Sequence, residues 1–377
     1  MTRRAISLPA VLASGVLVLA ACAETATEPP GSDAASGARS NVVATSIQVV
    51  MSNLDAPRQM AWGPEGGLYV VEAGNREING PCAAVYRGNN CYSGTGAVTR
   101  LWKGKQERVA EGLPSVYNPD VNDISGPQDI SFQGRGNARI TIGWGSDPAH
   151  RAQLGELAAG FGSLLQLRPN GSWRTMADVS ALERELNPAG GPFDSNPYGA
   201  LAEGDVTYVT DAGGNSLIEV AANGATSVVA VFSPIPVPPG PFNPPFAASE
   251  PVPTEVVRGP DGALYASLLT GVPFLPGAAS IMRVVPGQAP VVHEGGFAMI
   301  TDFDWAADGS LYLVQYASAP FFGGPGLLIR IAPDGSRTVL TDQLLQATGV
   351  LAAPDGSVYV SHHGNQPGTG EVLRVVP

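Results

Sequence analysis

The stretch Val350-Leu-Ala-Ala-Pro-Asp-Gly-Ser-Val-Tyr-Val-Ser361 places an Asp-Gly turn between two runs of apolar residues. Asp-Gly flanked by alternating apolar residues is a strong short-range signal for a β-hairpin. The same unit recurs along the chain, with full copies at 60–72, 256–267 and 303–314 and degenerate copies that begin at Ile130 and Tyr198. Self-similarity of this kind predicts a repeat architecture built of hairpins.

A second hairpin follows each copy, for example around Asn170-Gly171, Asn223-Gly224 and Asp334-Gly335. Four strands per repeat form the blade of a β-propeller. The turn glycines at positions 66, 136, 204, 262, 309 and 356 give six repeats. The alternative is an open β-sandwich with coincidental turns. The sequence thus predicts an all-β fold, a six-bladed β-propeller of four-stranded blades.

The two ends of the repeat region predict how the ring closes. Residues 370–376 form a third strand that no fourth strand follows, and residues 45–51 form a strand with no blade of its own. If the N-terminal strand becomes the outermost strand of the last blade, the ring closes and both exposed edges are covered.

The first 22 residues are expected to be a bacterial lipoprotein signal peptide. Arg3 and Arg4 precede an apolar run too short to span a bilayer, and Leu19-Ala-Ala-Cys22 closes it as a lipobox, so that Cys22 is the lipidated residue. The alternative is an ordinary signal peptide. Residues 23–42 have the composition of a flexible tether, and residues 43–377 form the propeller. We expect an extracytoplasmic protein of the cell envelope, such as the periplasm, held at the membrane by its lipid.

Composition and charge exclude several classes of partner. With 47 Gly, 34 Pro and only 14% charged residues, the chain has a turn-rich β composition. Loss of the signal peptide takes the formal net charge from −12 to −14. A body this negative repels phosphate backbones, so we expect no nucleic acid. The expected partners are a small molecule or an envelope protein, bound by a monomer.

Two cysteines remain after Cys22. Cys82 and Cys91 lie nine residues apart in a Gly- and Asn-rich segment, which predicts a loop-closing disulfide in an oxidising compartment. A metal site on this pair is the weaker alternative, because no histidine is nearby.

Every long insertion falls on one face of the predicted propeller, which we call the loop-rich face. The turns on the other face are all tight. The insertions follow the second and fourth strands of the repeats and span 74–96, 145–160, 178–194, 233–253, 271–278 and 317–325. A ligand or partner is therefore expected at the loop-rich face.

Two rings of side chains are expected to line the channel mouth on that face. Counting back from the turn glycines, with a proline-anchored register in the first two blades, gives a first ring of Arg58, Gln128, Asn196, Thr254, Thr301 and Thr348. The second ring, at the ends of the second strands, is Glu72, Ile142, Asp211, Leu268, Gln315 and His362. We predict ligand contacts for Arg58, Gln128, Asn196, Glu72, Asp211, Gln315 and His362, of which the two acids and the histidine could supply acid–base groups. The alternative is that these side chains only face channel water. Glu255 and Asp302, one residue past the first ring, are expected to cap strand ends.

Several runs of this sequence resemble the ScyD/ScyE family. They are Ser195-Asn-Pro-Tyr-Gly199, Tyr208-Val-Thr-Asp-Ala-Gly-Gly-Asn215, Val252-Pro-Thr254 with Gly259-Pro-Asp-Gly262, Leu269-Thr-Gly-Val-Pro-Phe274, and Cys82…Cys91-Tyr92 with Thr95-Gly-Ala-Val-Thr-Arg100. The likeness covers about residues 50–377. It implies an exported six-bladed propeller and little about its chemistry.

The repeat also resembles propellers of the gluconolactonase and strictosidine-synthase types. In the lactonase type, acidic or amide residues at the tops of the innermost strands bind a divalent metal, for which calcium is the candidate ion here. Asn196 matches that pattern, including its separation from Asp211, whereas Arg58 and Thr254 stand where carboxylates would be wanted. A cation next to Arg58 would be repelled, so no metal ligand is assigned.

The motifs that the chain lacks separate the function hypotheses. It has no Gly-x-Ser-x-Gly elbow, no His-Glu-x-x-His motif, no phosphate-binding glycine loop and no Cys/His cluster. The favoured hypothesis is a lipid-anchored binding or scaffold module that uses the loop-rich face. The alternative is a metal-dependent propeller hydrolase acting on a small metabolite, and the sequence leaves the question of an enzyme open.

Overall fold

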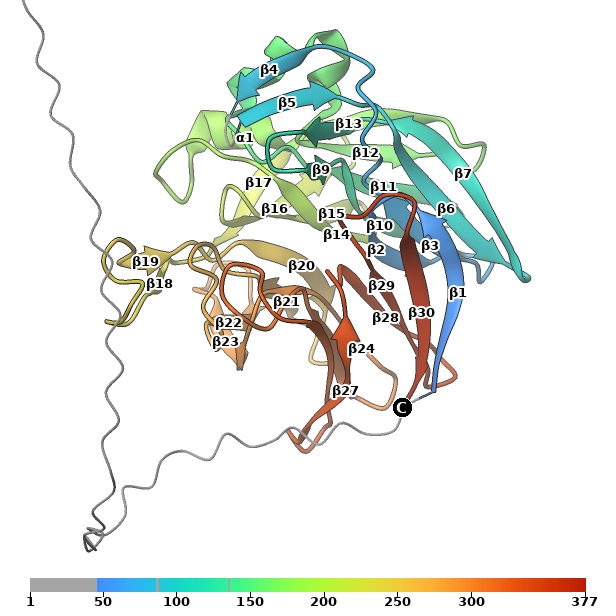
Figure 1. Ribbon diagram of the computed structural model, residues 1–377, viewed down its shortest axis with the longest axis vertical. Coiled ribbons are helices and arrows are strands. Elements are labelled where there is room, and N and C mark those ends of the chain that lie inside the picture. Colours follow the sequence, from blue (N-terminus) through green and yellow to red (C-terminus); the bar gives the residue numbers. More distant parts are fainter. Residues whose placement is uncertain (1–45, 86–87, 135) are drawn as a thin grey trace, which may run out of the picture. The chain divides into compact units, whose positions relative to one another are not determined.

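The computed structural model describes residues 46–85, 88–134 and 136–377 (Figure 1). The predicted signal peptide, the lipidated Cys22 and the tether at 23–42 lie outside the described residues. In the described part, six four-stranded antiparallel sheets have their strands in the order of a meander, and we number them blades 1 to 6 along the chain.

The strands of blades 1 to 3 run from the innermost to the outermost. Blade 1 comprises β2 (Pro57–Trp62), β3 (Leu68–Glu72), β6 (Gly96–Trp102) and β7 (Lys105–Leu113). Blade 2 comprises β10 (Pro127–Gln133), β11 (Asn137–Ile142), β12 (Ser163–Leu167) and β13 (Trp173–Asp178). Blade 3 comprises β14 (Pro197–Glu203), β15 (Val206–Asp211), β16 (Ser216–Ala221) and β17 (Thr226–Val231).

Blades 4 to 6 follow the same plan. Blade 4 comprises β20 (Pro253–Arg258), β21 (Leu264–Leu268), β22 (Ala279–Val284) and β23 (Val291–Phe297). Blade 5 comprises β24 (Ile300–Trp305), β25 (Leu311–Gln315), β26 (Gly326–Ile331) and β27 (Arg337–Leu344). Blade 6 comprises β28 (Gly349–Ala352), β29 (Val358–His362), β30 (Gly370–Val376) and, as its outermost strand, β1 (Ser46–Leu54).

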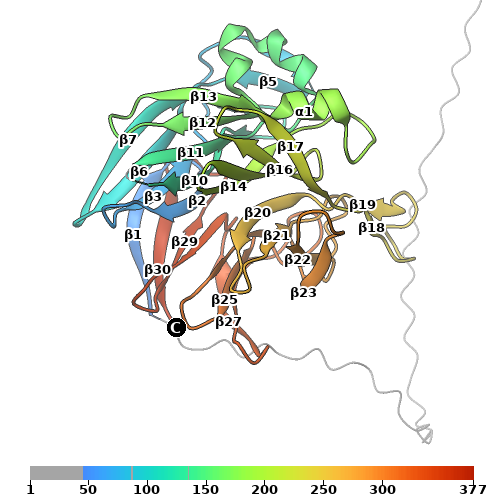
Figure 2. The ribbon, with the colours of Figure 1, turned by 180° about the vertical axis from the view of Figure 1, so that it is seen from behind.

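The innermost strands form a closed ring. They contact one another in the order β2, β10, β14, β20, β24 and β28, and β28 returns to β2. The N-terminal strand β1 pairs with β30, and the two lie side by side in both views (Figures 1 and 2). The predicted all-β propeller with an N-terminal closing strand is therefore confirmed.

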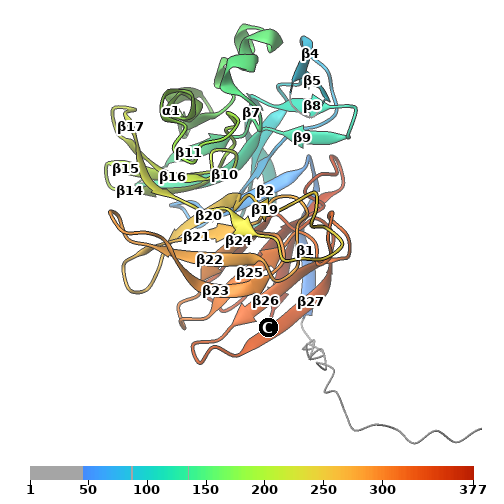
Figure 3. The ribbon, with the colours of Figure 1, turned by 90° about the vertical axis from the view of Figure 1, so that its left-hand side faces the viewer.

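The insertions carry small elements that the strand repeat does not predict. The strands β4 (Cys82–Val85), β5 (Gly88–Tyr92), β8 (Val116–Asn118) and β9 (Asp123–Ser125) form a further sheet (Figure 3). The remaining elements are β18 (Ile235–Pro236) with β19 (Ala248–Ser249), the 3-10 helices η1 (Pro148–Leu154) and η2 (Glu156–Gly160), and α1 (Val179–Leu186). The predicted disulfide is confirmed, since Cys82 and Cys91 are bonded directly across the β4–β5 pair.

The Asp-Gly turns are stabilised in the same way in three blades. Gly356 has a φ of 82°, a left-handed conformation that suits glycine. The preceding Asp355 accepts a hydrogen bond from the Ser357 amide at 3.0 Å and pairs with Arg374 of the third strand at 2.8 Å. The equivalent acids of blades 4 and 5 pair with the third strand in the same way, as Asp261–Arg283 and Asp308–Arg330. The Asp-Gly dipeptide therefore marks a turn and also a local set of hydrogen bonds and ion pairs made by its aspartate.

Hydroxyl side chains join the innermost strands of neighbouring blades. Thr254 donates to the Ile300 carbonyl at 2.9 Å, and Thr301 donates to the Ala347 carbonyl at 2.9 Å. Thr348 repeats the contact across the closing interface, where it donates to the Pro57 carbonyl at 2.8 Å. These threonines, predicted as ring members, are buried between the blades. Their hydroxyls donate hydrogen bonds to backbone carbonyls that no neighbouring strand pairs.

Carboxylates accept hydrogen bonds from backbone amides of the same innermost strands. Asp129 of β10 accepts a hydrogen bond from the Ala200 amide of β14, and Asp302 of β24 accepts one from the Val350 amide of β28, both at 2.7 Å. Because innermost strands of different blades do not pair through their backbones, side chains satisfy their buried edges.

Removal of the hydroxyl at the closing interface should destabilise the whole ring. Thr348→Val keeps the shape of the side chain but removes the 2.8 Å hydrogen bond to the buried Pro57 carbonyl, which then keeps only the long 3.5 Å contact from Arg58 Nη1. We therefore expect the free energy of unfolding to fall by about 1–3 kcal/mol. Urea titration measures this change. Thr175→Val, at an exposed position of β13, is the control and should change stability by less than about 0.5 kcal/mol. Equal effects of the two substitutions would contradict the structural role of Thr348.

Candidate functional site

The channel mouth begins at Arg58 and Gln128, two predicted ring residues that the structure brings together. The Arg58 Nε donates to Gln128 Oε1 at 3.1 Å. Its Nη2 donates to the Ile124 carbonyl at 2.8 Å and its Nη1 to the Gly364 carbonyl. Both side chains are buried, and Arg58 has only 7% of its surface exposed. The guanidinium therefore cross-links blades 1, 2 and 6 at the mouth of the channel.

In blade 3, the position equivalent to Arg58 belongs to Tyr198 and not to Asn196. The first residue of the innermost strand pairs 15 positions ahead in blade 1 (Pro57 with Glu72) but 14 positions ahead in blade 3 (Pro197 with Asp211). The turn glycine follows the proline by nine residues in blade 1 (Gly66) but by seven in blade 3 (Gly204), so a count made from the glycine is shifted by two residues. The proline that precedes Arg58, Gln128 and Thr254 also precedes Tyr198, and this signal locates the ring residue correctly.

Asn196 and Tyr198 have different surroundings. The Asn196 amide donates to Asp211 Oδ1 at 2.6 Å, and its side-chain Oδ1 accepts a hydrogen bond from the Trp144 amide at 3.0 Å. Burial raises the pKa of Tyr198 to about 12, so the phenol is neutral at physiological pH. Asn196 thus anchors the entry to blade 3, while Tyr198 presents a neutral phenol.

The two acids of the second ring are fully engaged by the protein. Glu72 is fully buried and accepts hydrogen bonds from the Asp55 amide at 2.6 Å, from the Thr99 hydroxyl, and from Arg108 at 2.8 Å. Through its hydrogen bond with Asp55, Glu72 joins the end of β1 to blade 1.

Asp211 holds the turn after β15. It accepts hydrogen bonds from the Ser195 hydroxyl at 2.7 Å, from the Asn196 amide, and from the amides of Gly213 and Gly214. Burial raises its pKa. Neither acid presents an unoccupied carboxylate to a ligand.

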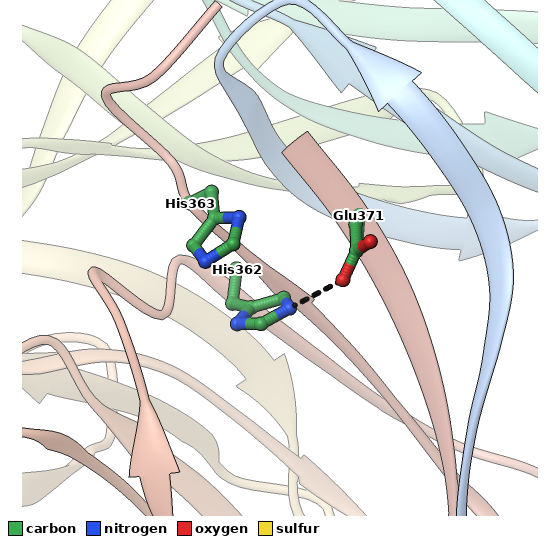
Figure 4. Close-up of side chains that lie close together, drawn as sticks. All are labelled: His362, His363 and Glu371. Carbon is green, nitrogen blue, oxygen red and sulfur yellow. Dashed lines mark hydrogen bonds and ion pairs between the residues drawn. The ribbon is translucent and has the colours of Figure 1, made fainter. Parts of the chain in front are cut away.

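Gln315 and His362 occupy the same level in blades 5 and 6. Gln315 Oε1 accepts a hydrogen bond from the Ala298 amide at 2.8 Å, and the side chain is 4% exposed. The ring of His362 stacks on that of His363 with 4.2 Å between centroids, and its Nε2 lies 3.2 Å from Glu371 Oε2 (Figure 4). Burial lowers the pKa of His362. The remaining members of the second ring, Ile142 and Leu268, are buried and apolar.

Three further carboxylates lie one residue deeper along the innermost strands. Burial raises the pKa of Asp129 to about 7, and it raises the pKa values of Glu255 and Asp302 well above the ordinary range. The negative charges of Asp129 and Asp302 raise the pKa of Glu255 further. The expected capping role of Glu255 and Asp302 is observed, since each accepts a hydrogen bond from the next backbone amide, but the electrostatic interaction among these acids was not predicted.

A cavity of about 720 Å³ lies where residues of five insertions meet blades 3 and 4. We call it the aromatic pocket. Its rings come from Phe246, Phe274, Phe322 and Tyr198. The other lining residues are Gly145, Asp194, Asn196, Ala212, Gly213, Ala248, Glu250, Val252, Thr254, Leu269, Thr270, Gly271 and Val272. Carboxylates line the pocket, and its described lining includes no Lys or Arg.

The aromatic wall of the pocket is held in a defined arrangement. The ring centroids of Phe274 and Phe322 lie 4.3 Å apart, and those of Tyr316 and Phe322 lie 5.6 Å apart. Thr270, Phe274 and Phe322 have φ values of 72°, 58° and 62°. Left-handed backbone is costly for β-branched and bulky residues, and such strain concentrates at functional sites. The phenylalanines were not among the predicted site residues, although aromatic residues inside Pro- and Gly-rich insertions were a visible signal.

Comparison with known proteins extends the fold assignment only. No family model and no curated protein matches the chain. Among solved structures, a Thermus thermophilus protein described as an oxidoreductase (glucose dehydrogenase) is 18% identical, with a TM-score of 0.51 over 88% of this chain and all of that one. A Bacteroides thetaiotaomicron protein of unknown function is 8% identical, with a TM-score of 0.50 over 88% of this chain and 76% of that one. Regucalcin from Agrobacterium tumefaciens, a calcium-binding protein, is 14% identical, with a TM-score of 0.47 over 88% and 95%. The likeness to the first two, with TM-scores of 0.51 and 0.50, supports the fold alone.

The deep carboxylates predict a pH dependence of stability. An acid whose pKa is raised by folding binds its proton more tightly in the folded state, so stability falls as pH rises from about 4 through the raised pKa. Glu255→Gln removes one charge from the group. We expect this substitution to raise the melting midpoint by about 2 °C or more at pH 8 and to leave it unchanged at pH 4.

Glu185→Gln, at an exposed position of α1, is the matched control and should have no effect at either pH. A Glu255→Gln variant that melts lower than the parent at pH 8 would show that the Glu255 carboxylate stabilises the fold while ionised.

Proposed function

We propose that this chain is an exported, lipid-anchored propeller of the ScyD/ScyE type that binds a small, largely apolar molecule in the aromatic pocket. The observation that carries the proposal is the pocket itself, with four aromatic rings and a volume in the range of small-molecule sites. Because Asp194 and Glu250 line it without a basic residue among the described lining, the ligand is uncharged or cationic. Rings and carboxylates together suit such a molecule.

Binding is favoured over hydrolysis because the candidate catalytic groups are already in use. Glu72 and Asp211 each accept several hydrogen bonds from the protein, and Asn196 Oδ1 accepts one from the Trp144 amide. A lactonase-type calcium centre at Asn196 and Asp211 would have to displace these bonds. The hydrolase therefore remains the second candidate, and its cation is what the calcium experiment below tests.

The proposed location is the cell envelope. A disulfide is typical of an oxidising compartment, and Cys82–Cys91 is such a bond. Among the helices of the described residues, none combines the length and the hydropathy needed to cross a bilayer. In this proposal the attachment is the lipid on Cys22, and the tether at 23–42 holds a monomeric propeller away from the membrane surface.

An environment-sensitive neutral probe tests the pocket directly. We expect N-phenyl-1-naphthylamine to bind with saturable fluorescence enhancement, and Phe322→Ala or Phe274→Ala to weaken its affinity at least about tenfold, since each removes a ring from the wall. Phe321→Ala is the matched control, because Phe321 is 53% exposed like Phe322 but does not line the pocket. Equal loss in all three variants, or no saturable binding, would refute the pocket as the site.

Calcium distinguishes the two candidate functions. The proposal predicts the same melting midpoint in chelator and in excess calcium, because the Asp211 oxygens already have donors. A cation bound to the native state would raise the midpoint by mass action. A rise with calcium that Asn196→Ala abolishes would instead support the hydrolase.

A further inference from the structure

Two histidines and a glutamate meet at the end of blade 6 (Figure 4). His362 is the last residue of β29 and lies directly across from Glu371 of β30. His363 follows with a φ of 57°, a conformation uncommon outside glycine, and its ring stacks on that of His362. In a regular strand, successive side chains point to opposite faces. The left-handed turn brings both imidazoles to the same side as the carboxylate.

The two imidazoles differ in the contacts that their nitrogens make. His363 Nδ1 lies 2.8 Å from the Thr369 carbonyl, which can only accept a hydrogen bond, so Nδ1 carries the proton and Nε2 keeps a lone pair. His362 is 8% exposed, and its Nδ1 is buried with no hydrogen-bond partner in the described part of the chain. Its Nε2 faces Glu371 Oε2 and is the nitrogen that can be shared with a bound ion.

We propose that His362, His363 and Glu371 bind a divalent late transition-metal ion of the zinc class. One ligand atom from each residue lies within 4.8 Å of the other two, and His362 Nε2 and Glu371 Oε2 are 3.2 Å apart. Zinc–nitrogen and zinc–oxygen bonds of about 2.0–2.2 Å place neighbouring tetrahedral ligands about 3.3 Å apart. The His362–Glu371 pair has that spacing, and His363, whose ligand atom lies within 4.8 Å of the other two, needs to approach by up to about 1.5 Å.

The donor set selects the class of metal. Two imidazoles and one carboxylate suit zinc, nickel and copper, whereas calcium prefers six to eight oxygens. Three protein ligands leave a fourth position for water or another small ligand. The carbonyl of Thr369 orients the His363 ring from outside the ligand set, as hydrogen-bond partners of metal-bound histidines commonly do. The site is separate from the aromatic pocket, whose lining includes none of these residues.

Isothermal titration of the full chain, purified in detergent without a histidine tag, tests the proposal with ZnCl2 as the probe. We expect one equivalent of Zn2+ to bind and to raise the melting midpoint. His363→Ala and Glu371→Gln should each weaken the affinity at least about tenfold. His293→Ala is the control, because His293 is exposed on β23 and contacts Tyr265 instead, and it should leave affinity unchanged.

Two results would overturn the proposal. One is the absence of saturable zinc uptake by the parent protein. The other is uptake with the same affinity in the double variant His363→Ala/Glu371→Gln, which would place the ion elsewhere. Melting of the metal-free variants checks that they fold, and His362→Ala is left out because His362 is buried. Calcium in excess should leave the zinc affinity unchanged, and competition by calcium would also contradict the proposed donor set.

Discussion

The innermost strand of each blade has an edge that no other strand pairs, and the organisation of the molecule follows from that constraint. Backbone amides and carbonyls on these edges are buried, so each needs a partner from a side chain. Threonine hydroxyls donate hydrogen bonds to carbonyls of the next blade, and carboxylates such as Asp302 accept hydrogen bonds from its amides. Arg58 does the same for carbonyls at the mouth of the channel. The polar residues around the axis are therefore part of the framework.

This use of polar residues explains why the channel presents few free chemical groups. Glu72 and Asp211 are positioned where a propeller enzyme could place acids, but the protein supplies all of their hydrogen bonds. The deep carboxylates carry a related cost, because charges that serve neighbouring amides also repel one another. Recognition is consequently assigned to the insertions, whose aromatic side chains are not needed to join the blades.

Hairpin chemistry made the fold predictable from the sequence. Asp-Gly turns, alternating apolar residues and an unpaired N-terminal strand are local signals, and each corresponds to a blade hairpin or to the β1–β30 pair. The Cys82–Cys91 disulfide followed from cysteine number and spacing. The sheet of β4, β5, β8 and β9 was not predicted, because its strands come from insertions on either side of β6 and β7 and pair only in three dimensions.

The site was less predictable, for reasons that particular residues illustrate. The preceding prolines placed Arg58 and Gln128 correctly. In blade 3 the turn glycine lies two residues closer to the proline, so a count from the glycine selected Asn196 in place of Tyr198. Counting also says nothing about which hydrogen bonds a buried acid has already made. Glu371 is the β30 partner of His362 and His363 is the next residue of the chain, so both could have been found by following the β29–β30 pairing to its end.

In this proposal the axial polar residues build the framework and the aromatic pocket binds the ligand. A crystal structure of the protein soaked with N-phenyl-1-naphthylamine tests this claim most directly. We expect the probe to lie between Phe246, Phe274 and Phe322, with the hydrogen bonds of Arg58, Glu72 and Asp211 unchanged. A probe lodged in the channel against Arg58, with those bonds broken, would contradict it.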